Sequence, residues 1–244
     1  MTKKRVLITG AAGRIGSSLA ESLRDRYDLR LLYHHTVPEN PPSSDVFRAD
    51  ISNYDEVAPS LVGMDAVVHM AADPSTRADW ASVRDRNIIG TYNVFEAARQ
   101  AGVQKIVFAS TNHTMGMYDR DRQWPIYANQ PPRPDSLYGV SKVFGETLGR
   151  HYVDQYGLSV ICLKIGWFLP KPHNEIALWM WLSPRDAAQV VWRAVESPLQ
   201  FGSFYAISRN GRRHWDITET MEKLGYRPED DAEPYAREIL GEAE

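Results

Sequence analysis

The sequence predicts an α/β fold built on a doubly wound parallel sheet. Short runs rich in β-branched residues alternate along the chain with longer segments that have a helical period. The runs VLI, AVVH and IVFAS are nearly continuously apolar, which suits strands that are covered by helices on both faces of a parallel sheet. A glycine-rich turn follows the first run and opens the first helical segment. This order is typical of doubly wound, Rossmann-type folds.

The expected elements follow the same alternation. Strands are predicted at Arg5–Thr9, Leu29–His34, Asp45–Arg48, Ala66–Met70, Lys105–Ser110 and Ser159–Ile165, and helices at Arg14–Arg26, Tyr54–Leu61, Trp80–Ala101 and Leu137–Gln155. Residues Tyr118–Asp135 contain four prolines and no clear period, so a long loop at the rim of the site is expected there. Right-handed crossovers between the strands would place helices on both faces of the sheet.

The C-terminal part of the chain is expected to cover the site. Residues 1–166 would form the Rossmann-type domain, and residues 167–244 a small C-terminal substrate lobe that is not an independent domain. Ser183 is predicted to cap a helix whose first turn holds Pro184, with Asp186 closing a capping box. The charged segment Glu229–Glu244 is predicted to be a solvated surface helix with a frayed end.

Composition excludes several classes of protein. The net charge of −3 over 244 residues gives no electrostatic reason for binding nucleic acid or an anionic membrane. No stretch approaches the roughly 18 apolar residues of a membrane span, and the N-terminal apolar run is too short for a signal peptide. The single cysteine, Cys162, excludes a disulfide framework and a cysteine-rich metal site. The sequence therefore predicts a soluble, cytoplasmic protein without a metal centre.

The first glycine turn has the spacing of a dinucleotide-binding site. The segment Thr9–Gly16 reads TGAAGRIG. Gly10 would allow the tight turn from strand to helix, Gly13 would let the backbone approach a pyrophosphate, and Gly16 would let helix and strand pack closely. A purely structural turn is the alternative, but the position between a first strand and a first helix favours a dinucleotide.

The next two strand ends bear on the choice between NAD and NADP. NAD-preferring proteins usually have an acidic residue after the second strand, whereas this strand ends in LLYHH. Without that acid nothing repels the 2′-phosphate of NADP, and Arg14, His34 or His35 would offer a positive contact. The sequence leans slightly to NADP, and NAD binding beside solvated histidines is the alternative. Asp50, followed by Ile51, is predicted to accept a hydrogen bond from the adenine amino group, or else to be a turn residue.

A tyrosine and a lysine four residues apart suggest the chemistry. Tyr138 and Lys142 would lie one turn apart on the same helix face, where the ammonium would favour the phenolate and lower its pKa. Such a tyrosine can take a proton from a hydroxyl as hydride leaves the adjacent carbon. Thr111, at the end of the fifth strand, would hydrogen-bond the reacting oxygen, and Asn112 and His113 would orient a sugar. Alternatively, these three are turn and structural residues.

Several segments together resemble a known family. TGAAGRIG, HMAAD, NIIGTYNVFEAA, FASTNHTMG and YGVSKVFGE resemble the extended short-chain dehydrogenase/reductase superfamily, in its NAD-dependent epimerase/dehydratase branch. Within that branch STNHT, RPDSLYGVSK and WLSPRD are similar to uronate dehydrogenases and to archaeal-type NAD-dependent glucose-6-phosphate dehydrogenases. The resemblance runs from Arg5 to about Gly166.

The resemblance implies an oxidoreductase that converts the anomeric hydroxyl of a sugar or sugar acid to a lactone with NAD or NADP. Thr111, Tyr138 and Lys142 would be the catalytic triad, and Asn87 would support the lysine through water. The expected substrate contacts are Ser75, Asn112, His113 and Trp167. The expected cofactor contacts are Gly10, Gly13, Arg14, Ile15, Gly16, His34, Asp50, Ile51, Ala71, Asn87, Tyr138, Lys142 and Ile165.

The chain departs from the uronate dehydrogenase pattern at two positions. That family places a serine after the glycine of the sixth strand and, a few residues later, an arginine that clamps the substrate carboxylate. Here Trp167 and Ile176 stand in those places. The two parallel N–H donors with which a guanidinium binds a carboxylate are therefore missing. Lys171, His173 or Arg77 would have to replace them. The nearby cluster WMWL is expected to form a hydrophobic wall, or else an aromatic platform for a sugar.

Other interpretations remain open. A sugar-phosphate dehydrogenase, or a sugar-nucleotide epimerase or dehydratase, would use the same triad, although residues 167–244 are few for a nucleotide-binding domain. A dinucleotide-sensing regulatory protein is the non-enzymatic alternative, and it would not need Tyr138 and Lys142 together. The helices Trp80–Ala101 and Leu137–Gln155 would form a homodimer interface, although their apolar period equally describes core packing.

Overall fold

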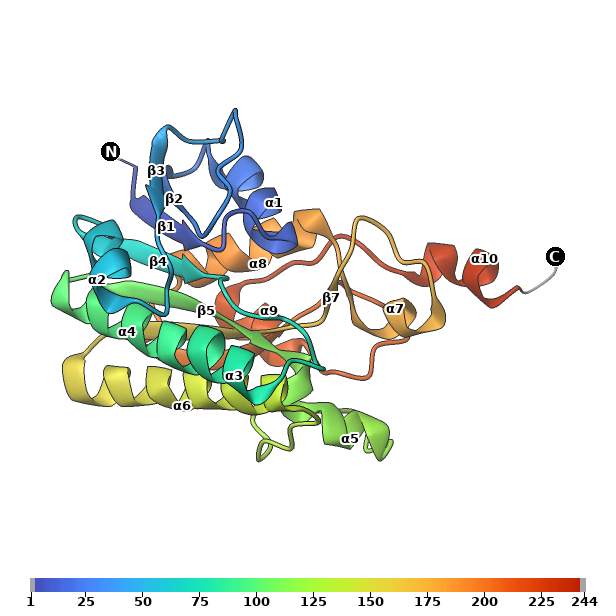
Figure 1. Cartoon of the computed structure of the whole chain (residues 1–244). Coiled ribbons are helices and arrows are strands. Elements are labelled where there is room, and N and C mark those ends of the chain that lie inside the picture. The colour runs from blue at the N-terminus through green and yellow to red at the C-terminus, as the bar shows by residue number, and fades with distance from the viewer. Residues whose placement is uncertain (1–2, 242–244) are drawn as a thin grey trace.

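The computed structural model describes residues 3–241, and its centre is a seven-stranded parallel sheet (Figure 1). The strand order is β3-β2-β1-β4-β5-β6-β9. The strands are β1 (Arg5–Thr9), β2 (Asp28–Tyr33), β3 (Asp45–Arg48), β4 (Ala66–His69), β5 (Lys105–Thr111), β6 (Ser159–Ile165) and β9 (Phe201–Ala206). The chain order reverses between β1 and β4, so a crevice is expected beyond their carboxyl ends. The predicted doubly wound fold is confirmed.

Helices cover both faces of this sheet (Figure 1). α1 (Arg14–Leu23) and α8 (Pro184–Glu196) pack on one face, and α4 (Gly90–Gln100) and α6 (Leu137–Tyr156) on the other. The remaining helices are α2 (Tyr54–Val57), η1 (Ala58–Leu61), α3 (Trp80–Ser82), η2 (Val83–Ile89), η3 (Asn112–Met115), α5 (Gly116–Arg120), α7 (Glu175–Met180), α9 (Thr218–Leu224), η4 (Glu233–Tyr235) and α10 (Ala236–Leu240). Within residues 3–241, no helix combines the length and apolarity that crossing a bilayer requires.

The nearly continuous apolar runs reflect this double cover. In β1, Val6 and Ile8 belong to the core cluster beneath α1 and α8, whereas Leu7 between them belongs to the cluster beneath α4 and α6. Successive side chains of a strand point to opposite faces, so a strand with two buried faces is apolar along most of its length instead of at every second position. The same pattern in β4 and β5 explains why these strands could be predicted.

The sheet extends past the expected limit at residue 166. β9 pairs in parallel with β6, with Val160 opposite Phe201 and Ile165 opposite Ala206. This edge strand was not predicted because its sequence, FGSFYA, contains glycine and serine and its first half is only partly buried. The Rossmann-type sheet therefore includes residues from the region assigned to the lobe.

Two other predictions need correction. The expected helix Trp80–Ala101 is divided into α3, the π-helical turn η2 and α4. The expected loop Tyr118–Asp135 begins three residues later than predicted, because α5 continues to Arg120. The rest of that loop contacts the C-terminal region through backbone hydrogen bonds between Ile126 and its partners His214 and Asp216.

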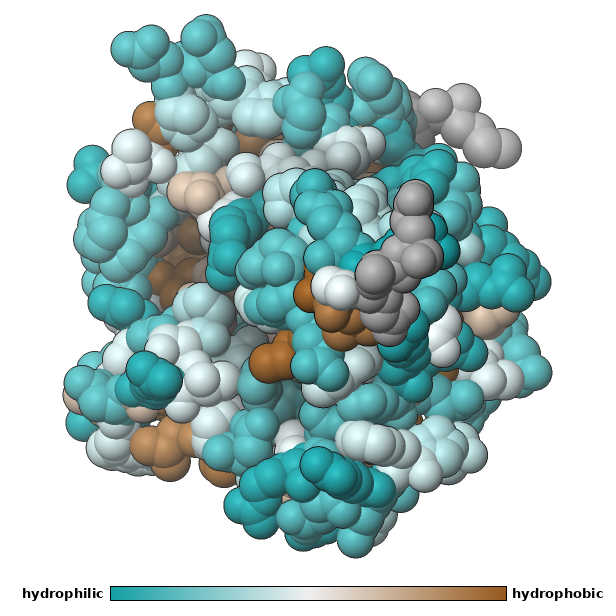
Figure 2. Space-filling view, turned by 90° about the vertical axis from the view of Figure 1, so that its right-hand side faces the viewer, coloured by the Kyte–Doolittle hydropathy of each residue, from teal (hydrophilic) through white to brown (hydrophobic). Residues whose placement is uncertain are grey.

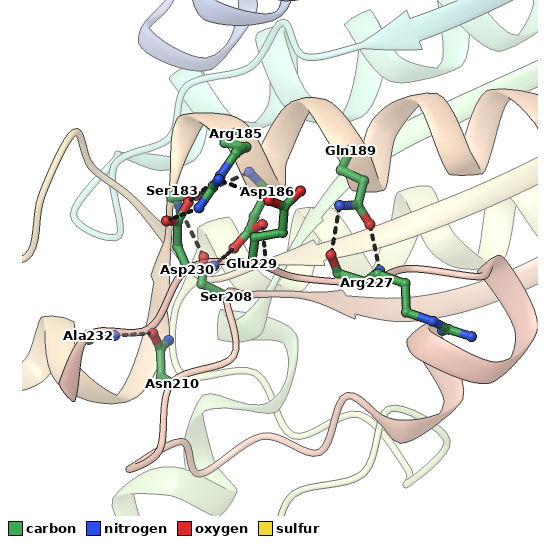
Figure 3. A network of polar contacts seen from close by, with 10 residues as sticks. All are labelled: Ser183, Arg185, Asp186, Gln189, Ser208, Asn210, Arg227, Glu229, Asp230 and Ala232. Atoms are coloured by element: carbon green, nitrogen blue, oxygen red, sulfur yellow. Dashed lines mark hydrogen bonds and ion pairs between the residues drawn. The ribbon is translucent and has the colours of Figure 1, made fainter. Parts of the chain in front are cut away.

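The start of α8 holds the C-terminal segment in place (Figure 3). Ser183 caps α8 as predicted, because its Oγ accepts a hydrogen bond from the Asp186 backbone N–H at 3.1 Å. The predicted capping box is wrong, because the backbone N–H of Ser183 donates to Ser208 Oγ. The Asp186 carboxylate instead accepts the backbone N–H groups of Glu229 at 2.8 Å and Asp230 at 3.1 Å. The segment predicted to be a solvated helix is thus fastened to α8 at its start; residues 242–244 lie outside the described residues.

Asp186→Ala is therefore expected to lower the free energy of unfolding by about 1–3 kcal/mol, because the part-buried backbone N–H groups of Glu229 and Asp230 would lose a charged acceptor. Asp186 has no exposed surface. Urea denaturation would measure the change. The matched control is Asp25→Ala at an exposed aspartate, for which a change of about 0.5 kcal/mol or less is expected. Equal effects at the two positions would contradict the assigned role of Asp186.

Candidate active site

A cavity of about 550 Å³ lies at the carboxyl ends of β1, β4, β5 and β6. Figure 2 looks onto this end of the molecule and shows a hollow with a brown, apolar inner surface. The walls comprise the glycine turn, the ends of three further strands, the start of α6, and β7 (Trp167–Phe168) with α7. The predicted residues that line it are Gly10, Gly13, Arg14, Ile15, Gly16, Thr111, Asn112, His113, Tyr138, Lys142, Ile165 and Trp167.

The glycine turn fits a bound pyrophosphate. Gly10 has a φ of +69°, in the left-handed region, and a Cβ at Gly16 would lie 2.2 Å from the Gly10 carbonyl oxygen. Side chains at these positions would force the turn apart. α1 begins after Gly13, and no side chain caps it, so its first backbone N–H groups face the cavity as anion donors.

Three polar side chains, those of His34, Arg48 and Asp50, gather where the adenosine of a dinucleotide is expected. His34 Nε2 lies 3.4 Å from Asp50 Oδ2, and Arg48 Nε donates to the His34 carbonyl oxygen at 3.4 Å. Asp50 also accepts the backbone N–H of Ser52 at 2.8 Å, as a turn residue does. Arg48 was not predicted, although its place at the end of the third strand was a usable signal. The adenine contact of Asp50 and Ile51 stays a prediction.

Buried hydrogen bonds fix the loop after β4. Asn87, in η2, accepts the backbone N–H of Asp73 at 2.8 Å and donates to its carbonyl oxygen at 3.0 Å. The Asn87 amide also donates to Ser141 Oγ at 3.1 Å, next to Lys142 in the chain. The backbone N–H of Ala71 donates to Thr9 Oγ1 at 3.2 Å. Asn87 therefore joins this loop to α6, and its predicted role through water stays a prediction.

The sequence of α6 places the tyrosine and the lysine at the cavity. Ser136 caps the helix by accepting the Gly139 N–H at 3.1 Å. Gly145 lets the helix lie close to β5, because a Cβ there would come within 2.2 Å of the Phe108 ring. As a result, Lys142 Nζ lies 4.9 Å from the centre of the Phe108 ring and 5.7 Å from the centre of the Tyr138 ring.

Burial disfavours the charged forms of both groups. Burial raises the pKa of Tyr138 to about 12, against the lowering effect of its hydrogen bond with Thr111. Burial also lowers the pKa of Lys142 to about 7. His69 lies beneath them, and burial with the nearby charge of Lys142 lowers its pKa to about 3, so this histidine is neutral. An ammonium and a phenolate formed together would offset part of each other's desolvation cost.

The turn after β5 brings the remaining predicted polar groups to the cavity. Thr111 Oγ1 accepts the backbone N–H of His113 at 3.2 Å and lies 3.3 Å from Asn112 Oδ1. His113 Nδ1 lies 2.8 Å from Asp135 Oδ2. If the imidazole is neutral and donates from Nδ1, its Nε2 is left as an acceptor. Asp135, which sequence reasoning missed, also accepts from Ser136 Oγ at 2.9 Å and so links His113 to the start of α6.

A second missed network lies behind the turn. Lys164 Nζ contacts the Glu146 carboxylate at 2.7 and 2.8 Å and Thr114 Oγ1 at 2.9 Å. Glu146 also accepts from Ser110 Oγ, and Thr114 Oγ1 donates to the Thr111 carbonyl oxygen at 2.8 Å. The network therefore fixes both ends of the turn. A lysine inside the apolar run SVICLKI was the signal that could have revealed it.

Of the predicted substrate contacts, one does not lie at the cavity. Trp167 lines the cavity together with Phe168, Ile176 and Met180. Ser75 is exposed and does not line it, because its hydroxyl accepts the backbone N–H of Arg77 in the neighbouring turn at 3.1 Å. Residues 3–241 contain no group of three or more His, Cys, Asp or Glu placed to hold a metal ion.

Comparison with known proteins agrees with this geometry. Residues 6–174 match the sequence model of the NAD dependent epimerase/dehydratase family. The chain is 41% identical to an L-arabinose 1-dehydrogenase (NAD(P)(+)) of Haloferax volcanii, covering 93% of this chain and 97% of the relative. It is 37% identical to an NAD-dependent glucose-6-phosphate dehydrogenase of the same organism, covering 96% of each.

Solved structures agree as well. A variant of the uronate dehydrogenase from Agrobacterium tumefaciens, solved in complex with NAD, superposes with a TM-score of 0.89 at 33% identity. The superposition covers 100% of this chain and 91% of that one. The resemblances read from the sequence are therefore confirmed, and the similarity extends through the C-terminal region as well as the dinucleotide-binding part.

Proposed function

The chain belongs to the NAD-dependent epimerase/dehydratase family, and from this premise we propose that it oxidises the anomeric hydroxyl of a sugar or sugar acid to a lactone with NAD(P)⁺. The observation that carries the proposal is the convergence of Thr111, Tyr138 and Lys142 on the cavity that also holds the glycine turn. A protein that only sensed a dinucleotide would not need a buried lysine next to a tyrosine at that place.

The proposed mechanism assigns one role to each residue. The Thr111 hydroxyl hydrogen-bonds the substrate oxygen on C1, and the Tyr138 phenolate accepts a hydrogen bond from the C1 hydroxyl and takes its proton. Lys142 stabilises that phenolate by its charge. Asn112 and His113 hold other hydroxyls of the sugar. The bound dinucleotide supplies the hydride acceptor, and the apolar wall of Ile165 and Trp167 excludes water from the reacting carbon.

A substrate screen tests this proposal directly. Purified protein is mixed with NAD⁺ or NADP⁺ and with aldoses, uronates or sugar phosphates, and the absorbance of the reduced nicotinamide is followed. We expect reduction with at least one sugar, with a lactone as the product in solution. If no sugar reduces either cofactor while both cofactors bind, the dehydrogenase proposal is wrong.

We also propose that NADP is accepted at least as well as NAD. Two features of the strand ends support this preference. Arg48 and His34 lie together where the second and third strands end, and the second strand ends without a carboxylate. Arg48→Ala is expected to weaken NADP binding about tenfold more than NAD binding, since guanidinium groups recognise phosphate strongly. Titration of both cofactors measures this, with Arg24→Ala at an exposed arginine as the control. A wild-type protein that strongly prefers NAD would contradict the proposal.

A homodimer through α4 and α6 is proposed as well. The support is the exposure of large apolar side chains on and next to these helices. They are Ile89, Tyr92, Leu137, Val140 and Tyr156.

A further inference from the structure

One wall of the cavity is apolar. Trp167 and Phe168 come from β7, and Ile176 and Met180 come from α7. These side chains line the same cavity as Tyr138 and Lys142 at the start of α6. A sugar ring whose C1 hydroxyl reaches Tyr138 would therefore lie with other ring substituents against this wall.

The basic groups that line the cavity have other tasks. Arg14 belongs to the glycine turn, where the pyrophosphate is expected. Lys142 lies beside Tyr138 and is buried with only 2% of its surface exposed. His113 is paired with the carboxylate of Asp135. Among the described residues that line the cavity, none at the apolar wall offers a positive charge.

The three candidates for replacing an arginine clamp do not line the cavity. Lys171 Nζ lies 5.8 Å from the ring of Tyr235, in the C-terminal segment. The His173 ring packs edge-on against Trp167 at 5.3 Å. Arg77 lies in the exposed turn that also holds Ser75. The structure therefore supplies no fixed cation for an acidic substituent.

The wall is braced from behind, so it is not free to rearrange. Ala177 and Leu178 of α7 pack in a buried cluster with Ala232 and Ala236 of the C-terminal segment. Asn210 holds that segment by accepting the Ala232 N–H at 3.2 Å and donating to the Trp181 carbonyl oxygen at 2.9 Å. Figure 3 shows how this contact and the Asp186 hydrogen bonds fasten the segment beside α8.

We propose that this site selects neutral aldoses and rejects sugars in which C5 carries a carboxylate or a phosphorylated hydroxymethyl group. The inference rests on the proposed function and narrows it to one class of substrate. A carboxylate held against Trp167, Phe168, Ile176 and Met180 loses hydration without gaining a paired cation, and that loss is costly. A hydroxymethyl group or a hydrogen atom at the same place loses far less.

The test compares sugars that differ only at C6. Galactose is paired with galacturonate, and glucose with glucuronate and glucose 6-phosphate, under saturating cofactor. We expect kcat/KM to be about 100-fold higher for the neutral member of each pair. If a uronate or the phosphate is used as well as its neutral partner, the inference is overturned while the dehydrogenase proposal stands. If no sugar is oxidised, either here or in the wider screen of aldoses, uronates and sugar phosphates, the proposed function itself fails.

An engineered clamp provides the second arm. Ile176 is 48% exposed at the edge of the cavity, so an arginine fits there without entering the core. In Ile176→Arg the ratio of kcat/KM for galactose to kcat/KM for galacturonate is expected to fall at least about tenfold, because a guanidinium pairs with a carboxylate. Ile176→Gln, which is polar but uncharged, should leave the preference unchanged. An unchanged preference in Ile176→Arg, with normal binding of cofactor, would overturn the wall as the cause of selectivity.

Discussion

Tyr138→Phe is expected to lower kcat by about 10²–10⁴-fold while dinucleotide binding stays within about twofold of the wild-type value. The substitution removes only the hydroxyl that takes the substrate proton. Tyr138 lies at the start of α6, whereas the glycine turn that would hold the pyrophosphate lies across the cavity on α1. Steady-state turnover and a titration of cofactor fluorescence measure the two effects separately.

The matched control for this variant is Tyr156→Phe. Tyr156 ends the same helix and is 52% exposed, far along α6 from the cavity. Loss of the Tyr156 hydroxyl should leave kcat unchanged. Turnover of Tyr138→Phe equal to that of the control would remove the catalytic assignment, whereas a joint loss of turnover and cofactor binding would point to a disturbed cavity.

The parts of the fold that could be predicted are those governed by local pattern. Strands with both faces buried are apolar along most of their length, so β1, β4 and β6 were evident from the sequence. The glycine turn was evident because Gly10 must adopt a positive φ and Gly16 must lie against a carbonyl oxygen. The helix carrying Tyr138 and Lys142 was evident from its spacing.

The missed features depend on contacts between distant segments. The pairing of Asp135 with His113 joins residues 22 positions apart, and that of Glu146 with Lys164 joins a helix to a strand. A sequence read alone cannot tell which charged residues will meet. β9 was missed for a related reason, because an edge strand with one partner needs no uninterrupted apolar run. The C-terminal segment looked solvated because its charged residues outnumber the two buried alanines that face α7.

If Lys142 stabilises the Tyr138 phenolate, removing its charge should shift the pH profile of kcat/KM for sugar oxidation. The proposed base is the Tyr138 phenolate, so kcat/KM should rise with pH as that proton is lost. Burial raises the pKa of Tyr138 to about 12 in the cofactor-free protein and lowers that of Lys142 to about 7. In the proposed mechanism the Lys142 ammonium and the Tyr138 phenolate form together, and each favours the charged form of the other. Lys142→Met removes the positive charge. The pKa of Tyr138 then rises, and the rising limb of the profile should move to higher pH.

At neutral pH the Lys142→Met variant should therefore lose about 100-fold in kcat/KM, and part of that loss should be recovered as the pH is raised to about 10. The matched control is Lys223→Met on α9, where the lysine is exposed and paired with Glu219 at 2.9 Å. A loss of the same size at every pH would contradict control of the tyrosine pKa by the lysine, since removing only a positioning contact gives a parallel profile. The shift with pH separates the two roles because only the charge of Lys142 acts on the proton that Tyr138 must lose.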